Sequence, residues 1–365
     1  MSSTNCPTSA VLLLVAWFAS AAPAVAQGDA ERKDPRATVT NAGALVPFLE
    51  GTDVFFALKQ DTVFEADIQP HLVAYQNFTD LIDLTQQAKR PKNVAFSITG
   101  TPAVRLRMFD QVSNPVRTPS YMPRGNFQVI WARNVSAVAS AFAAGRTAAG
   151  GDAGSRVSLW EVHFTGGHHS NGQDGCFFDD EQRVGEDCVP PDPLPEEREV
   201  NKHDGSFSTN YLRVGMNYRR NILDDQLWAK REWGFRVDFE YHPRAWIDDE
   251  MEDLYGRART EFAASIASRE ISWCPKRAEA MGAIKAIAGH PDSVWPVAIT
   301  AQASCFPTRE GGWGFFVRYY GGQDYYNLGL LDNIQRVHVG ATFNQSGFFR
   351  FRQPGQGQGS GGVAR

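Results

Sequence analysis

The sequence predicts an all-β protein, a closed transmembrane barrel of about a dozen antiparallel strands. Three observations favour this class: an export signal, repeated two-residue alternation of apolar and polar side chains, and aromatic residues on the apolar faces. Aromatic residues make up 12% of the 365 residues, and 33 glycines suit a chain with many turns. The formal net charge of −5 gives no reason to expect nucleic acid as a partner.

Residues 1–26 resemble a secretory signal peptide. An apolar stretch at 10–19 is followed by Ala24-Val25-Ala26, the small-residue pattern of a cleavage site before Gln27. No Lys or Arg precedes the apolar stretch, so the α-amine alone supplies positive charge there. We expect residues 27–52 to form an N-terminal segment ahead of the barrel. Beyond the signal no run of about 20 apolar residues occurs, so membrane-spanning helices are not expected.

We expect the barrel to occupy residues 53–345. Within this range apolar side chains recur at every second position, as in strands that present two different faces. The clearest examples are Val104–Met108, Leu212–Tyr218, Phe235–Tyr241, Trp313–Tyr319 and Val337–Phe343. A soluble β-sandwich would give the same local pattern. The export signal, the aromatic load and the long polar loops favour a barrel, whose apolar faces meet lipid and whose sheet must close.

Four segments interrupt the alternation. The Ala- and Gly-rich residues 137–156 predict a flexible turn insertion, and the acidic, Pro-rich residues 173–205 predict an inserted extracellular loop. Residues 270–293 are hard to place, because Ala278–Ala288 fits either a strand or a loop helix. The Gly- and Gln-rich tail 346–365 is expected to be disordered.

Four cysteines remain after cleavage of the signal. An even number in an exported chain permits two disulfides. The sequence-local pairing joins Cys176 to Cys188 and Cys274 to Cys305, which is one of three possible pairings.

Residues with catalytic chemistry gather at the end of the segment 158–170. In a strand, His168 and Ser170 share the apolar face, roughly 7 Å apart at Cβ, as a base and a hydroxyl nucleophile. Asn210 has the same register in the next strand, so hairpin pairing would make it the cross-strand neighbour of His168. Its amide would orient the imidazole without adding charge at a lipid boundary. His169 points to the other face and is the weaker base candidate. On spacing alone, a lone His-x-Ser in a strand is more often structural.

With these residues the sequence resembles the outer membrane phospholipase A family. The resemblance rests on His168-x-Ser170-Asn171-Gly172 and on Ser206-Phe207-Ser208-Thr209-Asn210. Supporting matches lie upstream at Ser113-x-Pro115-x-Arg117-x-x-x-Tyr121-x-Pro123, and near the C-terminus at Asp324-Tyr325-Tyr326-Asn327 and in Asn333–Gly340. The loop 173–205 is longer than in the family, and residues 270–307 fit the family poorly.

The resemblance implies a 12-stranded antiparallel barrel in the bacterial outer membrane. It also implies hydrolysis of acyl esters of membrane phospholipids, a requirement for Ca2+ and a homodimer as the active state. Carried over by motif, Ser170 is the nucleophile, His168 the base and Asn210 the residue that orients the base. The implied calcium ligands are the Ser206 hydroxyl, the Gln173 carbonyl and Ser113 contributed by a second protomer. The backbone amide of Gly172 would help to stabilise the oxyanion.

Two other functions compete with this hypothesis. A non-enzymatic outer-membrane barrel, either a pore or an inactive relative, is compatible with the lumen-facing charges expected at Arg105, Arg213, Asp238 and Glu240. A soluble periplasmic sandwich with esterase activity ranks third. Five polar residues in the family's order are hard to explain in a passive pore, so the sequence favours the enzyme.

Overall fold

The computed structural model describes most of the chain between residues 48 and 343. The described residues are 48–58, 62–83, 87, 89–109, 119–143, 156–171, 182–184, 187–189, 208–224, 228–247, 255–269, 271, 273–290, 294–308, 312–326, 330 and 332–343. The segments predicted as signal peptide (1–26) and as C-terminal tail (346–365) lie outside them.

Most described residues belong to one antiparallel sheet. Its strands are β1 (Thr52–Ala57), β2 (Thr62–Ile68), β3 (Leu72–Gln76), β4 (Val94–Phe109), β5 (Ser120–Arg133), β6 (Arg156–Ser170), β9 (Ser208–Leu223), β10 (Ala229–Tyr241), β11 (Ala258–Ser268), β12 (Arg277–Ala288), β13 (Val297–Phe306), β14 (Gly314–Gln323) and β15 (Asn333–Phe343). A separate hairpin pairs β7 (Gln182–Val184) with β8 (Asp187–Val189).

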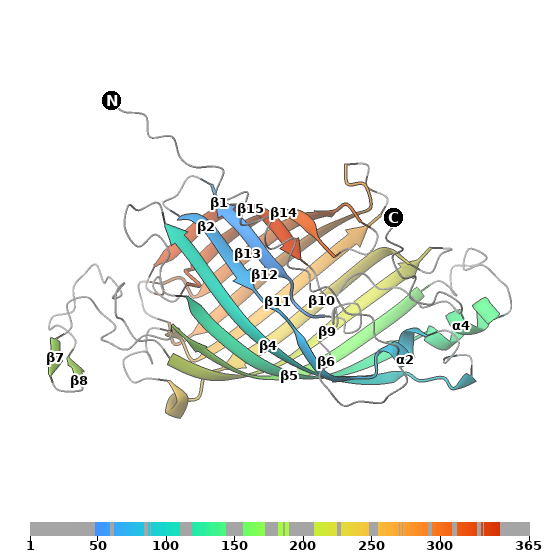
Figure 1. Cartoon of the computed structure of the whole chain (residues 1–365), viewed down its shortest axis with the longest axis horizontal. Coiled ribbons are helices and arrows are strands. Elements are labelled where there is room, and N and C mark those ends of the chain that lie inside the picture. Colours follow the sequence, from blue (N-terminus) through green and yellow to red (C-terminus); the bar gives the residue numbers. More distant parts are fainter. Residues whose placement is uncertain are drawn as a thin grey trace, which may run out of the picture.

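The sheet closes on itself. Neighbours in the sheet follow chain order from β4 to β15, β15 pairs with β1, and β1 pairs with β2. Closure comes from β2, which pairs along the second half of β4, while β3 pairs along the first half. Because β2 and β3 occupy one position in the ring, the barrel has 12 positions. The predicted 12-stranded antiparallel barrel is confirmed (Figure 1).

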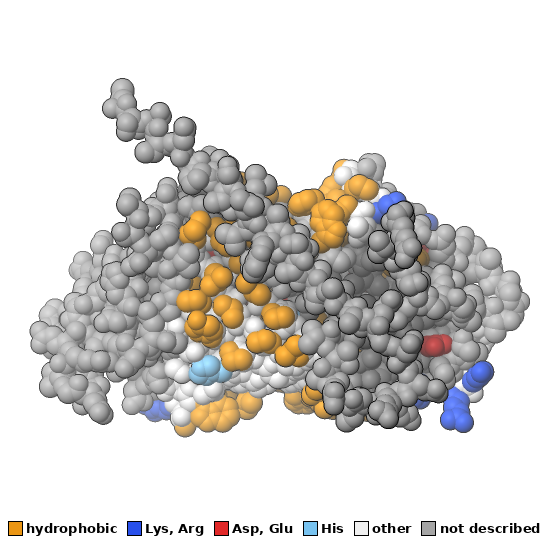
Figure 2. Space-filling view, in the orientation of Figure 1, with side chains coloured by type: hydrophobic (Ala, Val, Ile, Leu, Met, Phe, Trp, Pro, Cys, Tyr) orange, Lys and Arg blue, Asp and Glu red, His pale blue; other side chains and the backbone are white. Residues whose placement is uncertain are grey.

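The two faces of the sheet are the reverse of those in a soluble protein. Large apolar side chains are exposed on the outside, as the orange surface in Figure 2 shows. They include Phe96, Trp131, Phe164, Val214, Phe239, Phe262, Ile284, Ile299, Phe315 and Val339. The buried inward side chains are mostly polar, among them Glu65, Arg107, Gln128, Glu161, Asn217, Asp238, Arg277, Ser304 and His338. This arrangement is that of a barrel whose outer surface meets lipid.

One end of the barrel is closed by a small hydrophobic core. Two short helices, α2 (Thr79–Ile82) and α4 (Val135–Ala143), lie at this end (Figure 1). Leu81 and Val138 pack there with inward side chains of the adjoining strands, such as Ile130 and Leu159. None of the described helices is long and apolar enough to cross a membrane.

The turn predicted for residues 137–156 is wrong in its first part. Residues 137–143 belong to α4, and the remaining residues up to 155 lie outside the described chain. Alanine has the highest helix propensity, and Val135, Val138 and Ala139 gain a buried site on the barrel rim. Packing against the sheet therefore stabilises a helix that composition alone reads as a flexible turn.

The other end carries the β7–β8 hairpin (Figure 1) and a buried ionic cluster. The segment that follows β14 turns into the lumen. There Asp324 accepts two hydrogen bonds from Arg107, at 2.6 and 2.9 Å. Glu65 accepts a third from Arg107 at 2.7 Å, and the ring of Tyr326 lies under the same guanidinium.

The residues just before β1 also lie inside the barrel. Glu50 forms ion pairs with Arg124 of β5 at 2.7 Å and with Arg236 of β10 at 3.5 Å. Phe48 packs against the hydrophobic core at the helix end, under the Arg219 guanidinium. Both lumen ends and part of the middle are thus occupied by side chains.

The segment that was hard to place from sequence forms strand structure. Ala278–Ala288 lies within β12, so the strand alternative holds and the loop helix does not. A disulfide joins Cys274, just before β12, to Cys305 at the end of β13, with 5.6 Å between their Cα atoms. This bond is half of the sequence-local pairing; Cys176 lies outside the described residues.

Candidate active site on the outer face of the barrel

The candidate site lies where β6 ends and β9 begins. These strands pair without interruption, so His168 is opposite Asn210 and Ser170 is opposite Ser208. Because side chains alternate, these four residues share the outward face with Phe164, Leu212 and Val214, all of which are exposed. Regular pairing of the strands therefore positions the site, and the site faces away from the lumen.

The His168 and Asn210 side chains are hydrogen bonded. The distance between His168 Nδ1 and Asn210 Oδ1 is 2.9 Å. Since the amide oxygen can only accept, the imidazole donates from Nδ1, and Nε2 keeps a lone pair. An imidazole held in this tautomer can accept a proton at Nε2 from a hydroxyl on the same face, and Ser170 is two residues further along the strand.

The site sits at the edge of the apolar band. Ser170 pairs with Tyr121 of β5, whose ring is exposed on the outer face. Below them, towards the helix end, the outward positions carry Phe127 and Phe164. Tyrosine prefers the level at which lipid headgroups meet the hydrocarbon. Ser170 therefore lies beside an exposed tyrosine, on the hairpin-end side of the exposed Phe127 and Phe164.

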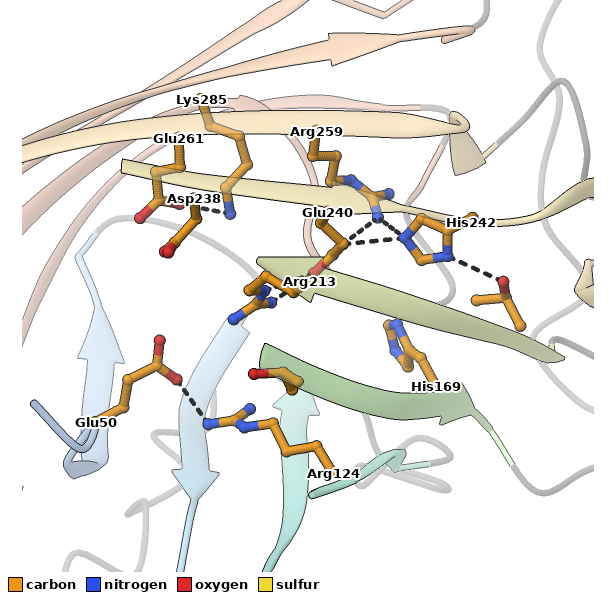
Figure 3. A network of polar contacts seen from close by, with 12 residues as sticks. Glu50, Arg124, His169, Arg213, Asp238, Glu240, His242, Arg259, Glu261 and Lys285 are labelled. Carbon is orange, nitrogen blue, oxygen red and sulfur yellow. Dashed lines mark hydrogen bonds and ion pairs between the residues drawn. The ribbon is translucent and has the colours of Figure 1, made fainter. Parts of the chain in front are cut away.

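The lumen side of the same strand ends is held by polar contacts. His169, between the two candidate residues, is buried, and its Nδ1 lies 2.9 Å from the Tyr255 hydroxyl. Thr209, next to Asn210, is fully buried, and its hydroxyl lies 3.0 Å from His242 Nδ1. Figure 3 shows His169 and His242 pointing into this network.

An ion cluster anchors the network in turn. Glu240 bonds Arg213 of β9, Arg259 of β11 and His242, so it connects three neighbouring strands (Figure 3). Burial lowers the pKa of His242, and the Arg259 guanidinium lowers it further, more than the hydrogen bond to Glu240 raises it. His242 is therefore neutral at neutral pH, and an uncharged ring buttresses Thr209.

Sequence reasoning missed this supporting network. Alternation correctly sends His169 and Thr209 inward, but it cannot identify their partners. Tyr255 lies 86 residues from His169 along the chain, and His242 lies 33 residues from Thr209. Pairing of β9 with β10 brings His242 beside Thr209, and the curvature of the sheet from β6 to β11 brings Tyr255 to His169.

Four predicted site residues, Ser113, Gly172, Gln173 and Ser206, lie outside the described residues. Their assignments as oxyanion donor and calcium ligands stay predictions. Among the described residues, no group of three or more His, Cys, Asp and Glu side chains could hold a metal ion.

Solved structures similar to this chain are outer-membrane proteins. Outer membrane phospholipase A from Escherichia coli matches with a TM-score of 0.42 and 12% identity, over 84% of this chain and 97% of that one. The calcium-bound outer membrane phospholipase dimer from Salmonella typhi matches with a TM-score of 0.42 and 13% identity, over 85% and 98%. OmpT of Vibrio cholerae matches with a TM-score of 0.25 and 9% identity, over 80% and 94%.

No protein-family model matches the chain, and no curated protein matches its sequence. At identities of 9–13% the structural likeness assigns no residue a role. The case for a function therefore depends on this chain's own geometry.

Proposed function

We propose that this protein is a phospholipase of the bacterial outer membrane, which hydrolyses acyl esters of glycerophospholipids. The observation that carries the proposal is the hydrogen-bonded His168–Asn210 pair, facing outward beside Ser170 at the edge of the apolar band. A catalytic site for a water-soluble substrate would have no reason to face outward at the edge of an apolar band. A phospholipid in the surrounding leaflet presents its ester groups at this depth.

The chemistry follows from the three side chains. Ser170 Oγ attacks the ester carbonyl while its proton moves to His168 Nε2, and Asn210 stabilises the resulting imidazolium through Nδ1. The tetrahedral intermediate collapses, and His168 returns the proton to the departing lysophospholipid oxygen. Water then attacks the acyl-serine with His168 again as base, which releases the fatty acid and restores Ser170.

The proposal includes a requirement for calcium and a homodimer as the active state, both on the ground of the sequence resemblance. Ser206 and Gln173 are within three residues of the paired Ser208 and Ser170, and Ser113 would come from the second protomer. These donors are neutral oxygens, a class that calcium accepts. When bound, the ion would supply positive charge beside the developing oxyanion, together with the Gly172 amide.

The test is phospholipid hydrolysis by refolded protein in detergent, with calcium or with chelator. Ser170→Ala removes the nucleophile, and we expect activity to fall at least ~1,000-fold with the barrel intact. Ser208→Ala is the matched control, because Ser208 is the cross-strand neighbour of Ser170 on the same face. Full activity in Ser170→Ala, or equal loss in both variants, would refute the nucleophile assignment. We expect chelation to abolish activity.

A further inference from the structure

A groove crosses the outer face of the barrel beside the candidate site. Its floor consists of glycines from three neighbouring strands in direct register: Gly100 of β4 pairs with Gly125 of β5, which pairs with Gly166 of β6. Leu72 of β3 lies opposite Gly100 at the far end. The groove is shallow and wide open to the surroundings, has a volume of about 520 Å³, and includes His168 among its lining residues.

The three floor glycines are not covered by neighbouring side chains. A Cβ added at Gly100, Gly125 or Gly166 meets no other atom within 4 Å. Glycine weakens a strand, since it adds backbone freedom and no packing. Three glycines in one row are therefore unfavourable for the barrel alone, and no neighbouring side chain requires them.

Outward side chains follow this floor on each side. Two residues away on one side, Ile98, Phe127 and Phe164 form a second row in register, and all three are exposed. On the other side the groove is lined by Pro102 and Pro123, which pair with each other, and by His168. The three glycines span two strand spacings, about 10 Å, and Leu72 on β3 extends the row to three spacings, about 14 Å.

We propose that this glycine groove holds one acyl chain of the phospholipid, with its ester at His168 and Ser170. This inference rests on the proposed function and adds how the substrate is held. The groove is linear, its exposed walls are apolar, and it opens at the residues where the ester carbonyl must lie. An unbranched hydrocarbon is the ligand that lipid around the barrel supplies. Packing of the hydrocarbon chain on the exposed glycine backbone stabilises binding in proportion to the length of hydrocarbon that is buried.

Gly125→Leu places a side chain in the middle of the groove, where an added Cβ meets no atom within 4 Å. We expect it to lower kcat/KM for a dipalmitoyl phospholipid by about 10-fold or more, because the leucine side chain occupies the space of the distal part of the acyl chain. Hydrolysis of a dibutyroyl phospholipid, whose chains end before Gly125, should stay within about 2-fold of wild type. Gly166→Leu, nearer to His168, should impair both substrates.

Gly282→Leu is the matched control. Gly282 is an outward glycine in β12, paired with Ala264 and Ala301 on a different part of the barrel, and a Cβ added there meets only the Thr300 carbonyl oxygen, at an ordinary contact distance of 4.0 Å. We expect this variant to hydrolyse both substrates as wild type does. Equal effects of Gly125→Leu on long and short chains, or no effect on either, would overturn the proposed groove.

A binding measurement separates this inference from the proposed function. In the Ser170→Ala background, a phospholipid with a diazirine in its acyl chain should label β3–β6 in vesicles, and Gly125→Leu should abolish that labelling while Gly282→Leu keeps it. Labelling of the groove by a protein that hydrolyses nothing would sustain the acyl site and reject the phospholipase. Hydrolysis with labelling spread evenly around the barrel would reject the acyl site. If Gly125→Leu no longer formed a crosslinked dimer, and its preference between long-chain and short-chain substrates stayed that of wild type, the groove would be assigned to contact with a second protomer.

Discussion

Two adjacent histidines have different environments because consecutive side chains in a strand point to opposite faces. His168 faces outward and donates to Asn210, whereas His169 faces the lumen and contacts Tyr255. The outward ring can meet a substrate, and the inward ring is buried. A single step along the chain thus separates a candidate base from a residue that supports the strand.

Asn210→Ala tests the orientation of His168. Without an acceptor at Nδ1 the ring loses its fixed tautomer, so we expect kcat to fall about 100-fold while KM is unchanged, since Asn210 need not touch the substrate. Asn210→Asp keeps an acceptor and should recover most of the activity. Steady-state kinetics on a phospholipid in mixed micelles provide the measurement. Wild-type kcat in Asn210→Ala would exclude the orienting role.

His242 predicts a pH dependence of stability. Its pKa in the folded protein is lowered, so the unfolded chain takes up the proton first as the pH falls. The stabilisation is complete above the unfolded value of about 6.5 and is lost below it, by at most about 1.4 kcal/mol per pH unit. The measurement is urea unfolding of wild type and His242→Gln at about pH 7.5 and about pH 5. The wild type should lose more stability than the variant; parallel losses would contradict the prediction.

The hairpin of β12 and β13 is stabilised by a disulfide where the alternation of apolar and polar side chains is weak. The outward face of β12 carries mostly small residues, including Ala278, Ala280 and Gly282, so on that face it offers few large side chains to neighbouring strands. The Cys274–Cys305 disulfide fixes this hairpin at the helix end of the barrel. The covalent link compensates for limited packing.

Replacing both Cys274 and Cys305 by serine should lower the free energy of unfolding by about 2–4 kcal/mol. Reductant should lower the stability of the wild type to a similar extent and leave the double variant unchanged. Urea titration with and without dithiothreitol measures both effects. A variant as stable as wild type would show that strand pairing alone holds the hairpin.

Local pattern predicted most elements, and long-range contact decided the rest. Strong alternation, as in Phe235–Tyr241, identifies both a strand and its outward face. Where small residues dominate, as in Ala278–Ala288 and in α4, the pattern is ambiguous and packing against neighbours decides between strand, helix and turn. The facing of Asn210 and His168 followed from register, but Tyr255 and His242 reach the site through strand pairing and sheet curvature that the local pattern does not specify.

In the part of the barrel that the structure describes, side chains occupy both ends of the lumen and part of its middle. The hydrophobic core at the helix end, the segment around Glu50 and the Arg107–Asp324 cluster occupy it in turn. A 12-stranded barrel has little room inside. These contacts weigh against the alternative function as a diffusion pore.

Vesicle swelling distinguishes a pore from a closed barrel. Vesicles that contain the refolded protein should be as impermeable to small sugars as protein-free vesicles, because paired charges and apolar side chains fill the path. A known porin, reconstituted in the same way, is the positive control. Rapid swelling with this protein would favour the pore over the phospholipase.

For the proposed phospholipase, the outward position of His168 and Ser170 also determines which substrate concentration governs activity. A substrate reaches an outward-facing pair by lateral diffusion in its leaflet and not from bulk water. The governing quantity is then the mole fraction of phospholipid in the leaflet around the barrel. An outer leaflet poor in phospholipid would keep the protein idle at any expression level. Activity would rise in proportion to each phospholipid that arrives there, so the barrel would report on the composition of the membrane that surrounds it.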